Sequence, residues 1–300
     1  FLTSNPNLKL RFALAIAYGS SVGGILTPIG TAPNLILLGL MHDKGMELIS
    51  FFEWIFMVAP LCILMLFALS AILSLGVDST PIELSDEKKA LTQDQKKVLF
   101  VLGGLVILLL LNAKMDPYWD GLGLSESGIL LGSGLLLFVT PLKILDWIED
   151  KENIPYRIMF LFGAGFSIAH AFTQTGLADE VASYLIEMTH LRPIFLLLVV
   201  ASLITFTTEI TSNTALISII LPVIYAVSQQ SGINATLFMM VATLCASYAF
   251  MLPIATPPNA IAMSSGVVDV KSMIRYGVLL NLVGIGLIVL IAEFFWSKLV

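Results

Sequence analysis

Long apolar segments recur along the whole chain, and they constrain its fold more than any other feature. Clear examples are residues 52–76 and 272–296, which contain few charged side chains. A helix that crosses a membrane needs about 20 mostly apolar residues, whereas transmembrane β-strands would be short and would alternate in polarity. Of the 300 residues, 57% are hydrophobic and only 12% are charged, about half of what a soluble domain carries. The sequence therefore predicts an all-α, polytopic membrane protein.

The remaining composition argues against several other classes. The net charge is −6, and we find no basic patch of the kind that binds nucleic acid. Both cysteines, Cys62 and Cys245, lie in apolar segments, so we interpret them as core residues rather than as a disulfide or a metal pair. The three histidines are scattered, so the sequence offers no metal or nucleophile–base constellation for an enzyme.

The distribution of basic residues predicts how the chain crosses the membrane. Loops 77–97 and 141–157 are rich in Lys and Arg, and placing both in the cytoplasm follows the usual bias of such residues. This orientation requires the segment 194–228, which is interrupted at 208–214, to enter and leave from one side. Its arms of about 14–17 residues are shorter than a ~30 Å hydrocarbon core demands, so we predict a re-entrant hairpin. Further spans are predicted over 9–27, 98–112, 124–140, 157–174 and 236–252, with an amphipathic stretch over 176–192.

Two segments of the chain resemble each other. "AYGSSVGGILTPIGTAPNLI" (17–36) aligns with "ATLCASYAFMLPIATPPNAI" (242–261), so that Thr31 matches Thr256 at an offset of 225 residues. In the predicted topology the two segments run in opposite directions through the membrane. Inverted repeats with broken helices are typical of secondary transporters, whose binding site lies between the repeats.

The repeat also predicts a missing element. Ser212 lies 44 residues before Thr256, and the same distance before Thr31 falls ahead of residue 1. We therefore expect the chain to be the C-terminal part of a longer protein, without a first hairpin and earlier spans.

The polar breaks supply groups for an anion and a cation side by side. Thr256 is expected to cap a half-helix that begins at Pro257, and Ser212 or Asn213 to cap the arm 215–228. The positive ends of half-helices favour an anion. Freed carbonyls, Thr hydroxyls and the Asn amide oxygen are hard ligands that suit Na⁺.

These motifs carry a family resemblance. "TEITSNTA" (208–215) with "LPIATPPNAI" (252–261), and "GGILTPIGTAPNLI" (23–36) upstream, resembles the divalent anion/sodium symporter family, over essentially the whole chain. The resemblance implies a set of substrate contacts and a set of sodium ligands. The substrate contacts would be Ser212, Asn213, Thr214, Thr256, Pro257 and Thr31. The sodium ligands would be Thr208, Thr211, Asn213, Ala255 and Gly30.

The resemblance further implies Na⁺-coupled uptake of a small divalent anion, for which we expect a C4-dicarboxylate before citrate or sulfate. It implies a homodimer, an elevator-like movement and a bacterial inner membrane. Residues 1–76 and 176–300 would form the transport part, with 77–175 as cytoplasmic loop and scaffold. The alternatives are an exchanger, a sulfate transporter of the same family and, in another class, an anion channel.

Some of these polar residues have plainer interpretations. For Glu209 we favour a structural bond that holds the hairpin, because an anion site gains nothing from a nearby carboxylate. Thr31 and Thr256 can satisfy carbonyls of their own helices. His170 is interpreted as a packing or capping residue.

Overall fold

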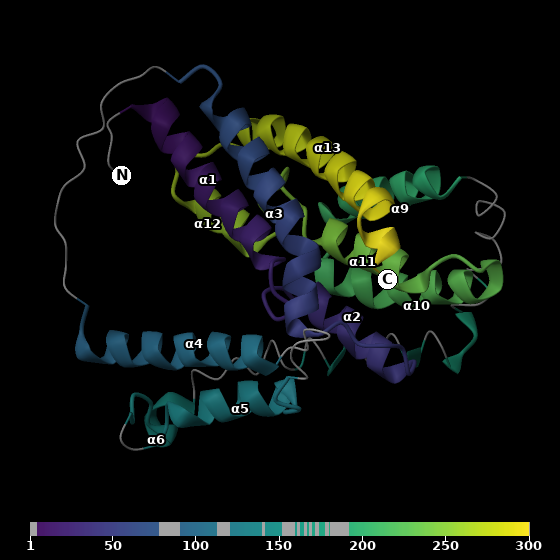
Figure 1. Cartoon of the computed structure of the whole chain (residues 1–300). Helices are drawn as coiled ribbons and strands as arrows, with labels where there is room; N and C mark the ends of the chain where they lie inside the picture. The colour runs from purple at the N-terminus through teal and green to yellow at the C-terminus, as the bar shows by residue number, and fades with distance from the viewer. Residues whose placement is uncertain are drawn as a thin grey trace. The chain divides into compact units, whose positions relative to one another are not determined.

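The computed structural model describes residues 5–77, 91–112, 121–139, 142–151 and 192–299, together with scattered residues between 160 and 180 (Figure 1). The chain divides into two compact units, which we treat separately. Unit 1 comprises Phe1–Leu48, Ile55–Glu83 and Phe160–Val300, and unit 2 comprises Ile49–Trp54 and Leu84–Met159. The predicted span over 157–174 and the amphipathic stretch over 176–192 fall largely outside the described residues.

The described part of the chain is helical and contains no strand, as the sequence predicts. Unit 1 holds α1 (Pro6–Gly24), α2 (Ala32–Asp43), most of α3 (Phe51–Ser74), α9 (Pro193–Thr208), α10 (Asn213–Ser231), α11 (Ala235–Ala246), α12 (Pro257–Ser264), α13 (Val270–Phe294) and the 3₁₀ turn η3 (Trp296–Lys298). Unit 2 holds the start of α3, α4 (Gln93–Asn112), α5 (Glu126–Leu136) and α6 (Trp147–Asp150).

Three helical segments in the described residues are long and apolar enough to cross a membrane. They are α3, α10 and the segment Val270–Lys298, which joins α13 to η3. Three shorter apolar helices, α5, α9 and α11, accompany them. Many of their large apolar side chains are exposed, as expected where the surrounding medium is lipid rather than water.

Two helix lengths differ from the prediction. Helix α5 has 11 residues, about 17 Å, so the predicted span over 124–140 is not one membrane-crossing helix. Helix α10 has 19 residues rather than about 14, because it continues to Gly232, whose φ of 73° ends it in the left-handed conformation that glycine favours. At about 28 Å, α10 is nearly as long as a hydrocarbon core is thick. The prediction of a re-entrant hairpin therefore depends on the orientation given by the basic loops and not on the length of this arm.

The second helix break also begins earlier than predicted. Helix α11 ends at Ala246 rather than near 252, and residues 247–256 separate it from α12. Glu209 explains the difference, since its carboxylate accepts from the N–H groups of Met251 (2.9 Å) and Leu252 (3.0 Å), which a continuous helix would direct to its own carbonyls. Within the break, Asn259 Nδ2 donates to the carbonyls of Ala249 (2.9 Å) and Leu252 (3.0 Å).

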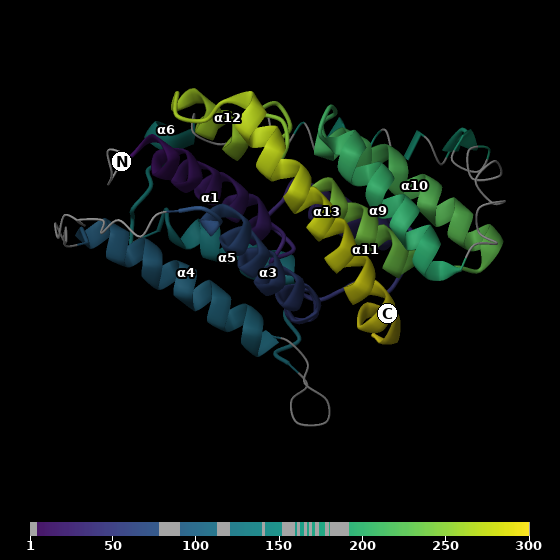
Figure 2. The same ribbon diagram turned by 90° about the horizontal axis from the view of Figure 1, so that it is seen from above.

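The broken helices of unit 1 pack crosswise. The first break covers residues 25–31, between α1 and α2, and the second covers residues 247–256, between α11 and α12. Helix α1 contacts α12, and α2 contacts α11. Helix α10 lies against α2 and α11. Helix α9 lies against α11 and α13 (Figure 2). The breaks and the hairpin turn are therefore brought into one neighbourhood.

Helix α3 is tied to its neighbours by hydrogen bonds to backbone carbonyls. Arg11 Nη1 donates to the carbonyls of Leu73 and Leu75, both at 2.6 Å, at the C-terminal end of α3, where carbonyls lack helical partners. At the other end, Trp296 Nε1 donates to Met57 at 2.8 Å. The Arg11 guanidinium also lies 5.8 Å from the Tyr276 ring centroid.

Replacing Arg11 with methionine is expected to lower stability without changing the packing of the side-chain stem. The last carbonyls of α3 lose a charged donor, which costs roughly 1–2 kcal/mol in a partly exposed position. Thermal unfolding of the detergent-purified protein measures this as a lower Tm. Arg275→Met is the matched control, because Arg275 is exposed and caps no helix end among the residues that the structure describes. Equal effects of the two substitutions would contradict the capping role.

Helix α13 begins at a well-defined cap. Asp269 Oδ1 accepts from the backbone N–H of Ser272 at 2.9 Å and its Oδ2 accepts from the Ser272 hydroxyl at 2.7 Å. These two hydrogen bonds, of which the one from the Ser272 hydroxyl has the larger effect, hold the pKa of the exposed Asp269 carboxyl below its usual value. The cap is complete above the ordinary Asp pKa and weakens as the pH falls through the lowered one.

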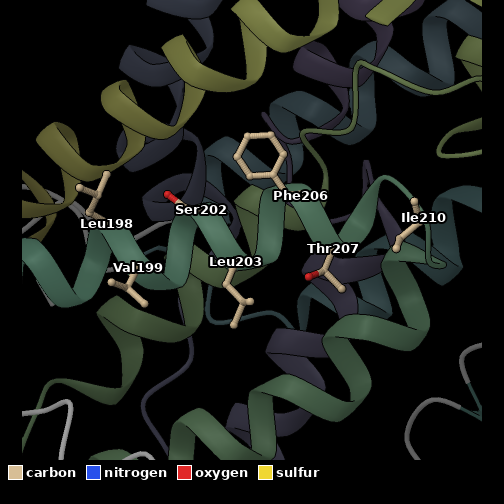
Figure 3. A pocket seen from close by; sticks show the side chains of 7 residues that line it. All are labelled: Leu198, Val199, Ser202, Leu203, Phe206, Thr207 and Ile210. Carbon is tan, nitrogen blue, oxygen red and sulfur yellow. The ribbon is translucent and has the colours of Figure 1, made fainter.

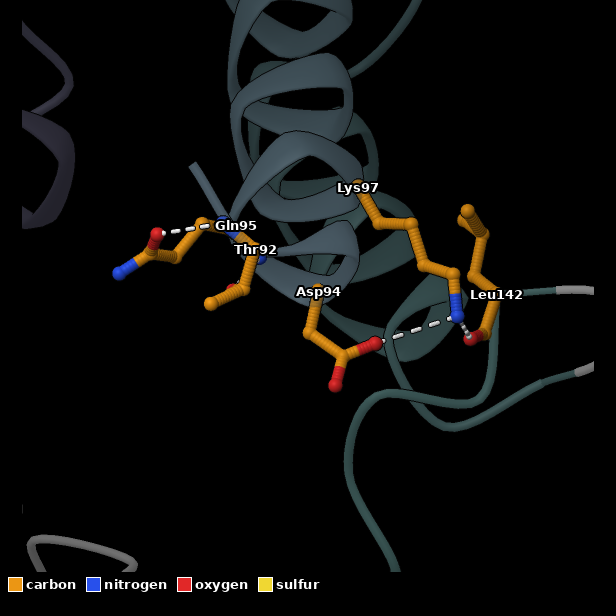
Figure 4. A network of polar contacts seen from close by, with 5 residues as sticks. All are labelled: Thr92, Asp94, Gln95, Lys97 and Leu142. Atoms are coloured by element: carbon orange, nitrogen blue, oxygen red, sulfur yellow. Dashed lines mark hydrogen bonds and ion pairs between the residues drawn. The ribbon is translucent and has the colours of Figure 1, made fainter. Parts of the chain in front are cut away.

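Unit 2 is built on helix caps and a helix pair. Thr92 and Gln95 form a reciprocal capping box at the start of α4, with backbone N–H to side-chain distances of 2.9 and 3.2 Å (Figure 4). In the next turn, Lys97 Nζ donates to Asp94 Oδ1 at 3.3 Å and to the carbonyl oxygen of Leu142 at 3.2 Å (Figure 4). Helix α4 packs against α5.

Candidate functional site

Three helices begin directly after the polar segments that the sequence analysis singled out. Thr31 precedes α2, Ser212 precedes α10 and Thr256 precedes α12. The predicted caps at Ser212 and Thr256 are confirmed: their hydroxyls accept from the N–H groups of Ala215 (3.5 Å) and Asn259 (3.4 Å). Each N-terminus presents backbone N–H groups with a partial positive charge, which favours a bound anion.

The two breaks share a backbone conformation at equivalent positions. Thr31 has φ −138° and ψ 150°, and Thr256 has φ −140° and ψ 149°. Asn34 Nδ2 donates to the Thr27 carbonyl at 2.9 Å, which repeats, 225 residues earlier, the bond from Asn259 to Leu252. Thr31 differs in one respect, because its hydroxyl makes no cap and instead accepts from the Ser247 hydroxyl at 3.4 Å.

Three oxygen atoms come together at the turn between α9 and α10. Thr208 Oγ1 lies 2.5 Å from Asn213 Oδ1 and 2.9 Å from the carbonyl oxygen of Ala246. A hydroxyl has one hydrogen, so Thr208 can donate fully to only one of these two acceptors at a time, and the cluster keeps oxygen lone pairs for a further ligand. A hard cation could be coordinated by these three oxygens.

Glu209 connects the hairpin turn to the second break and to α13. Its side chain is buried, with Oε1 accepting from the N–H of Met251 (2.9 Å) and from Asn281 Nδ2 (2.7 Å), and Oε2 accepting from the N–H of Leu252 (3.0 Å). These donors satisfy the carboxylate, as the structural interpretation of Glu209 predicts. The carboxylate thus serves the protein's own backbone rather than facing an incoming anion.

Glycine is required where the first break turns back on α1. A Cβ at Gly30 would overlap the carbonyl oxygen of Gly24 and would lie 3.0 Å from Thr27 Oγ1. The close approach of residues 24 and 30 is therefore a steric reason for glycine here, in addition to the ligand role that the resemblance implies for Gly30.

The structure brings some of the predicted site residues together and leaves others apart. Thr208 and Asn213 meet in the oxygen cluster, and Thr31 reaches the second break through Ser247. Thr211 instead donates to the Thr207 carbonyl within its own helical turn, at 2.9 Å. Of the predicted set, Thr208, Thr214, Ala255 and Thr256 are buried, whereas Gly30, Thr211, Ser212 and Pro257 are exposed.

Sequence reasoning missed three participants. The carbonyl of Ala246 and the hydroxyl of Ser247 follow the unexpected early end of α11, and Asn281 lies in the middle of α13. Asn281 did carry a signal, because an amide within an otherwise apolar segment needs a polar partner. A backbone carbonyl has no such signature.

An apolar groove on α9 is a poor alternative site. It is lined by Leu198, Val199, Leu203, Phe206 and Ile210, with the hydroxyls of Ser202 and Thr207 (Figure 3). The lining contains no charged group and few donors for an anion.

Residues 7–300 match the protein family described as "sodium:sulfate symporter transmembrane region". The chain belongs to the sodium:sulfate symporter family. It is therefore an integral membrane protein of a transporter family, and the resemblance drawn from the SNT and TPPN motifs is confirmed.

Curated relatives of the chain are named for organic anions. A sodium-dependent dicarboxylate transporter of Staphylococcus saprophyticus is 32% identical over 97% of this chain and 60% of the relative. The Na(+)/dicarboxylate cotransporter 3 of Rattus norvegicus is 30% identical over 97% of this chain and 57% of the relative. The Na(+)/citrate cotransporter of Rattus norvegicus is 27% identical over 93% of this chain and 59% of the relative. The chain thus spans about 60% of the length of the curated relatives it matches.

Proposed function

We propose that the protein couples the entry of Na⁺ to the uptake of a small divalent anion, with a C4-dicarboxylate as the first candidate. The observation that carries this proposal is the oxygen cluster of Thr208, Asn213 and Ala246, directly beside the N-terminus of α10. A cation and an anion bound there would be neighbours and would stabilise each other, which is the physical basis of coupling. Family membership and the relatives' names support both partners.

The cation would be Na⁺ held by neutral oxygens. Thr208 and Asn213 supply side-chain oxygens and Ala246 a carbonyl, with Thr211, Ala255 and Gly30 as further candidates from the family resemblance. Among the described residues no group of three or more His, Cys, Asp or Glu side chains is placed to hold a metal ion. A ligand set of neutral oxygens is what Na⁺ needs and what a transition metal would not prefer.

The anion would bind at the helix N-termini, where it needs no basic side chain. Ser212, Asn213 and Thr214 begin α10, Thr256 and Pro257 begin α12, and Thr31 begins α2. Free N–H groups and hydroxyls there can donate to carboxylate oxygens. Segments 208–214 and 253–259 contain no Lys or Arg, which argues against an exchanger that replaces Na⁺ with a fixed cation.

The transport cycle we propose uses an inverted repeat. The twin conformations of Thr31 and Thr256, the repeated Asn34 and Asn259 bonds and the crosswise packing of α1, α2, α11 and α12 support it. We propose that α9 and α10 form a re-entrant hairpin and that residues 1–76 and 176–300 move in an elevator-like manner against a scaffold of 77–175. A homodimer in a bacterial inner membrane completes this proposal.

Uptake by the full-length protein in liposomes tests the proposed function. We expect radiolabelled succinate to accumulate under an inward Na⁺ gradient and not with K⁺ on both sides. Accumulation that ignores Na⁺ but responds to succinate preloaded inside would indicate an exchanger instead. If succinate fails, uptake of sulfate or citrate under the same gradient would reassign the substrate, and failure of all three anions would refute the proposal.

A further inference from the structure

The buried carboxylate of Glu209 has a role that the Na⁺ and anion sites do not themselves require. We propose that Glu209 is a positioning residue that fixes the second break against the hairpin turn, and that it thereby couples the cation cluster to the anion-binding start of α12. This inference rests on the proposed function, which it deepens.

The contacts of Glu209 are unusually complete for a charged group. Its side chain is 2% exposed, and its two oxygens accept from the backbone of Met251 and Leu252 and from the side chain of Asn281. All of these partners are donors, so the arrangement fits the ionised carboxylate, which only accepts. None of the ion pairs in the described part of the chain includes Glu209.

A buried charge without a charged partner is costly, so it needs a second reason to stay. Glu209 directly follows Thr208, whose hydroxyl belongs to the oxygen cluster. A cation bound by Thr208 would be held by the residue next to Glu209 in the chain and would offset part of the charge of the carboxylate. The carboxylate therefore strengthens the cation site from outside, while its oxygens remain bound to backbone N–H groups.

Leu252 transmits the position of Glu209 to the next helix. Its N–H donates to Glu209 at 3.0 Å, and its carbonyl accepts from Asn259 Nδ2 at 3.0 Å and from the N–H of Ala255 at 3.3 Å. Asn259 lies in the first turn of α12, whose cap is Thr256. A displacement of the carboxylate therefore moves both groups of Leu252 and, with them, the N-terminus that would hold the anion.

The test separates the position of the carboxylate from its charge. Glu209→Gln keeps the shape but places an amide N–H against backbone N–H groups. The exchange Glu209→Gln with Asn281→Asp keeps one carboxylate in the same place between α9 and α13, but takes it away from the break. Glu47→Gln is the matched control, because Glu47 is exposed.

Two readouts are measured on the full-length protein. The first is the Na⁺ concentration for half-maximal succinate uptake, recorded separately from the maximal rate. The second readout needs no transport. It is the rate at which a thiol reagent labels a cysteine placed at the exposed position Ile254, with any other exposed cysteine replaced. This rate is measured in detergent, with and without Na⁺. Cys62 and Cys245 are buried and add little background.

We expect Glu209→Gln to raise the half-maximal Na⁺ concentration by about tenfold or more, in line with the loss of hydrogen bonds to a charged group. In the wild-type protein, Na⁺ is expected to slow the labelling at position 254. We expect Glu209→Gln to raise this labelling rate several-fold and to abolish the slowing by Na⁺. The exchange Glu209→Gln with Asn281→Asp is expected to restore neither readout. Normal values for both readouts would overturn the proposal, and so would rescue by the exchange, because charge alone would then suffice.

If Glu209→Gln does not fold, Asn281→Leu decides the same question with one donor removed and both backbone bonds kept. A severalfold rise in the half-maximal Na⁺ concentration supports the positioning role, and no rise refutes it. Should the wild-type protein transport none of the tested anions, the proposed function fails while the labelling experiment still tests the positioning of the break.

Discussion

Replacing Asn213 with alanine is expected to reduce Na⁺-driven uptake about ten- to a hundredfold at low Na⁺ concentration. The substitution removes Oδ1, which lies 2.5 Å from Thr208 Oγ1, and it does so at the first residue of α10. One side chain thus serves the cation and borders the anion, and losing a ligand to a charged partner costs roughly 1.5–3 kcal/mol. Initial rates of succinate uptake over a range of Na⁺ concentrations measure the effect.

Asn7→Ala provides the comparison for this variant, because the Asn7 side chain is exposed in the first turn of α1. The number of folded transporters in each liposome preparation must be equal, which size-exclusion chromatography establishes. Uptake by Asn213→Ala with an unchanged dependence on Na⁺ would remove Asn213 from the cation site. It would leave family membership untouched.

Gly277→Ala is expected to destabilise unit 1 strongly. Its Cβ would lie 2.5 Å from the carbonyl carbon of Phe250 and 2.7 Å from the Cα of Met251, so backbone rather than a flexible side chain would have to move. Overpacking of this kind costs roughly 1–3 kcal/mol. The displaced segment carries the N–H groups that bind Glu209, so we expect a lower Tm together with a higher half-maximal Na⁺ concentration.

Gly286→Ala is the control on the same helix, because a Cβ there meets nothing within 4 Å. Alanine is the better helix former by about 1 kcal/mol, so this substitution should leave Tm unchanged or raise it. Opposite signs for the two glycines would locate the effect at the contact between α13 and the second break. A fall in Tm of equal size in both would show that α13 as a whole, rather than this contact, tolerates no added methyl group.

The sequence was most informative where a local rule decides the structure. Thr256 followed by Pro257 and Pro258 predicts a helix start, because proline suits the first turn and threonine suits the cap. Ser212 was one of two residues named for the cap of α10. The composition likewise predicts apolar helices throughout the described residues.

Sequence reasoning failed where distant residues compete for the same backbone. Nothing within Ser247–Leu252 shows that α11 stops at Ala246, because the N–H groups of Met251 and Leu252 are bound by Glu209, which lies 42 and 43 residues earlier in the chain. The pairing of Glu209 with Asn281 spans 72 residues, and no local pattern encodes it. The oxygen cluster depends on the same early end of α11, so its third member was not predicted.

The side-chain bond across each break has a consequence for the order in which the protein assembles. Asn34 reaches Thr27, and Asn259 reaches Leu252, over seven residues of chain, so each break is encoded within its own helix pair. Closing so short a loop costs little entropy and takes little time. The bonds of Glu209 to Leu252 and Asn281 span 43 and 72 residues and need three segments in place. The breaks can therefore form while the chain is still being inserted, and Glu209 ties the second break to α9 and α13 only once the last helix has arrived.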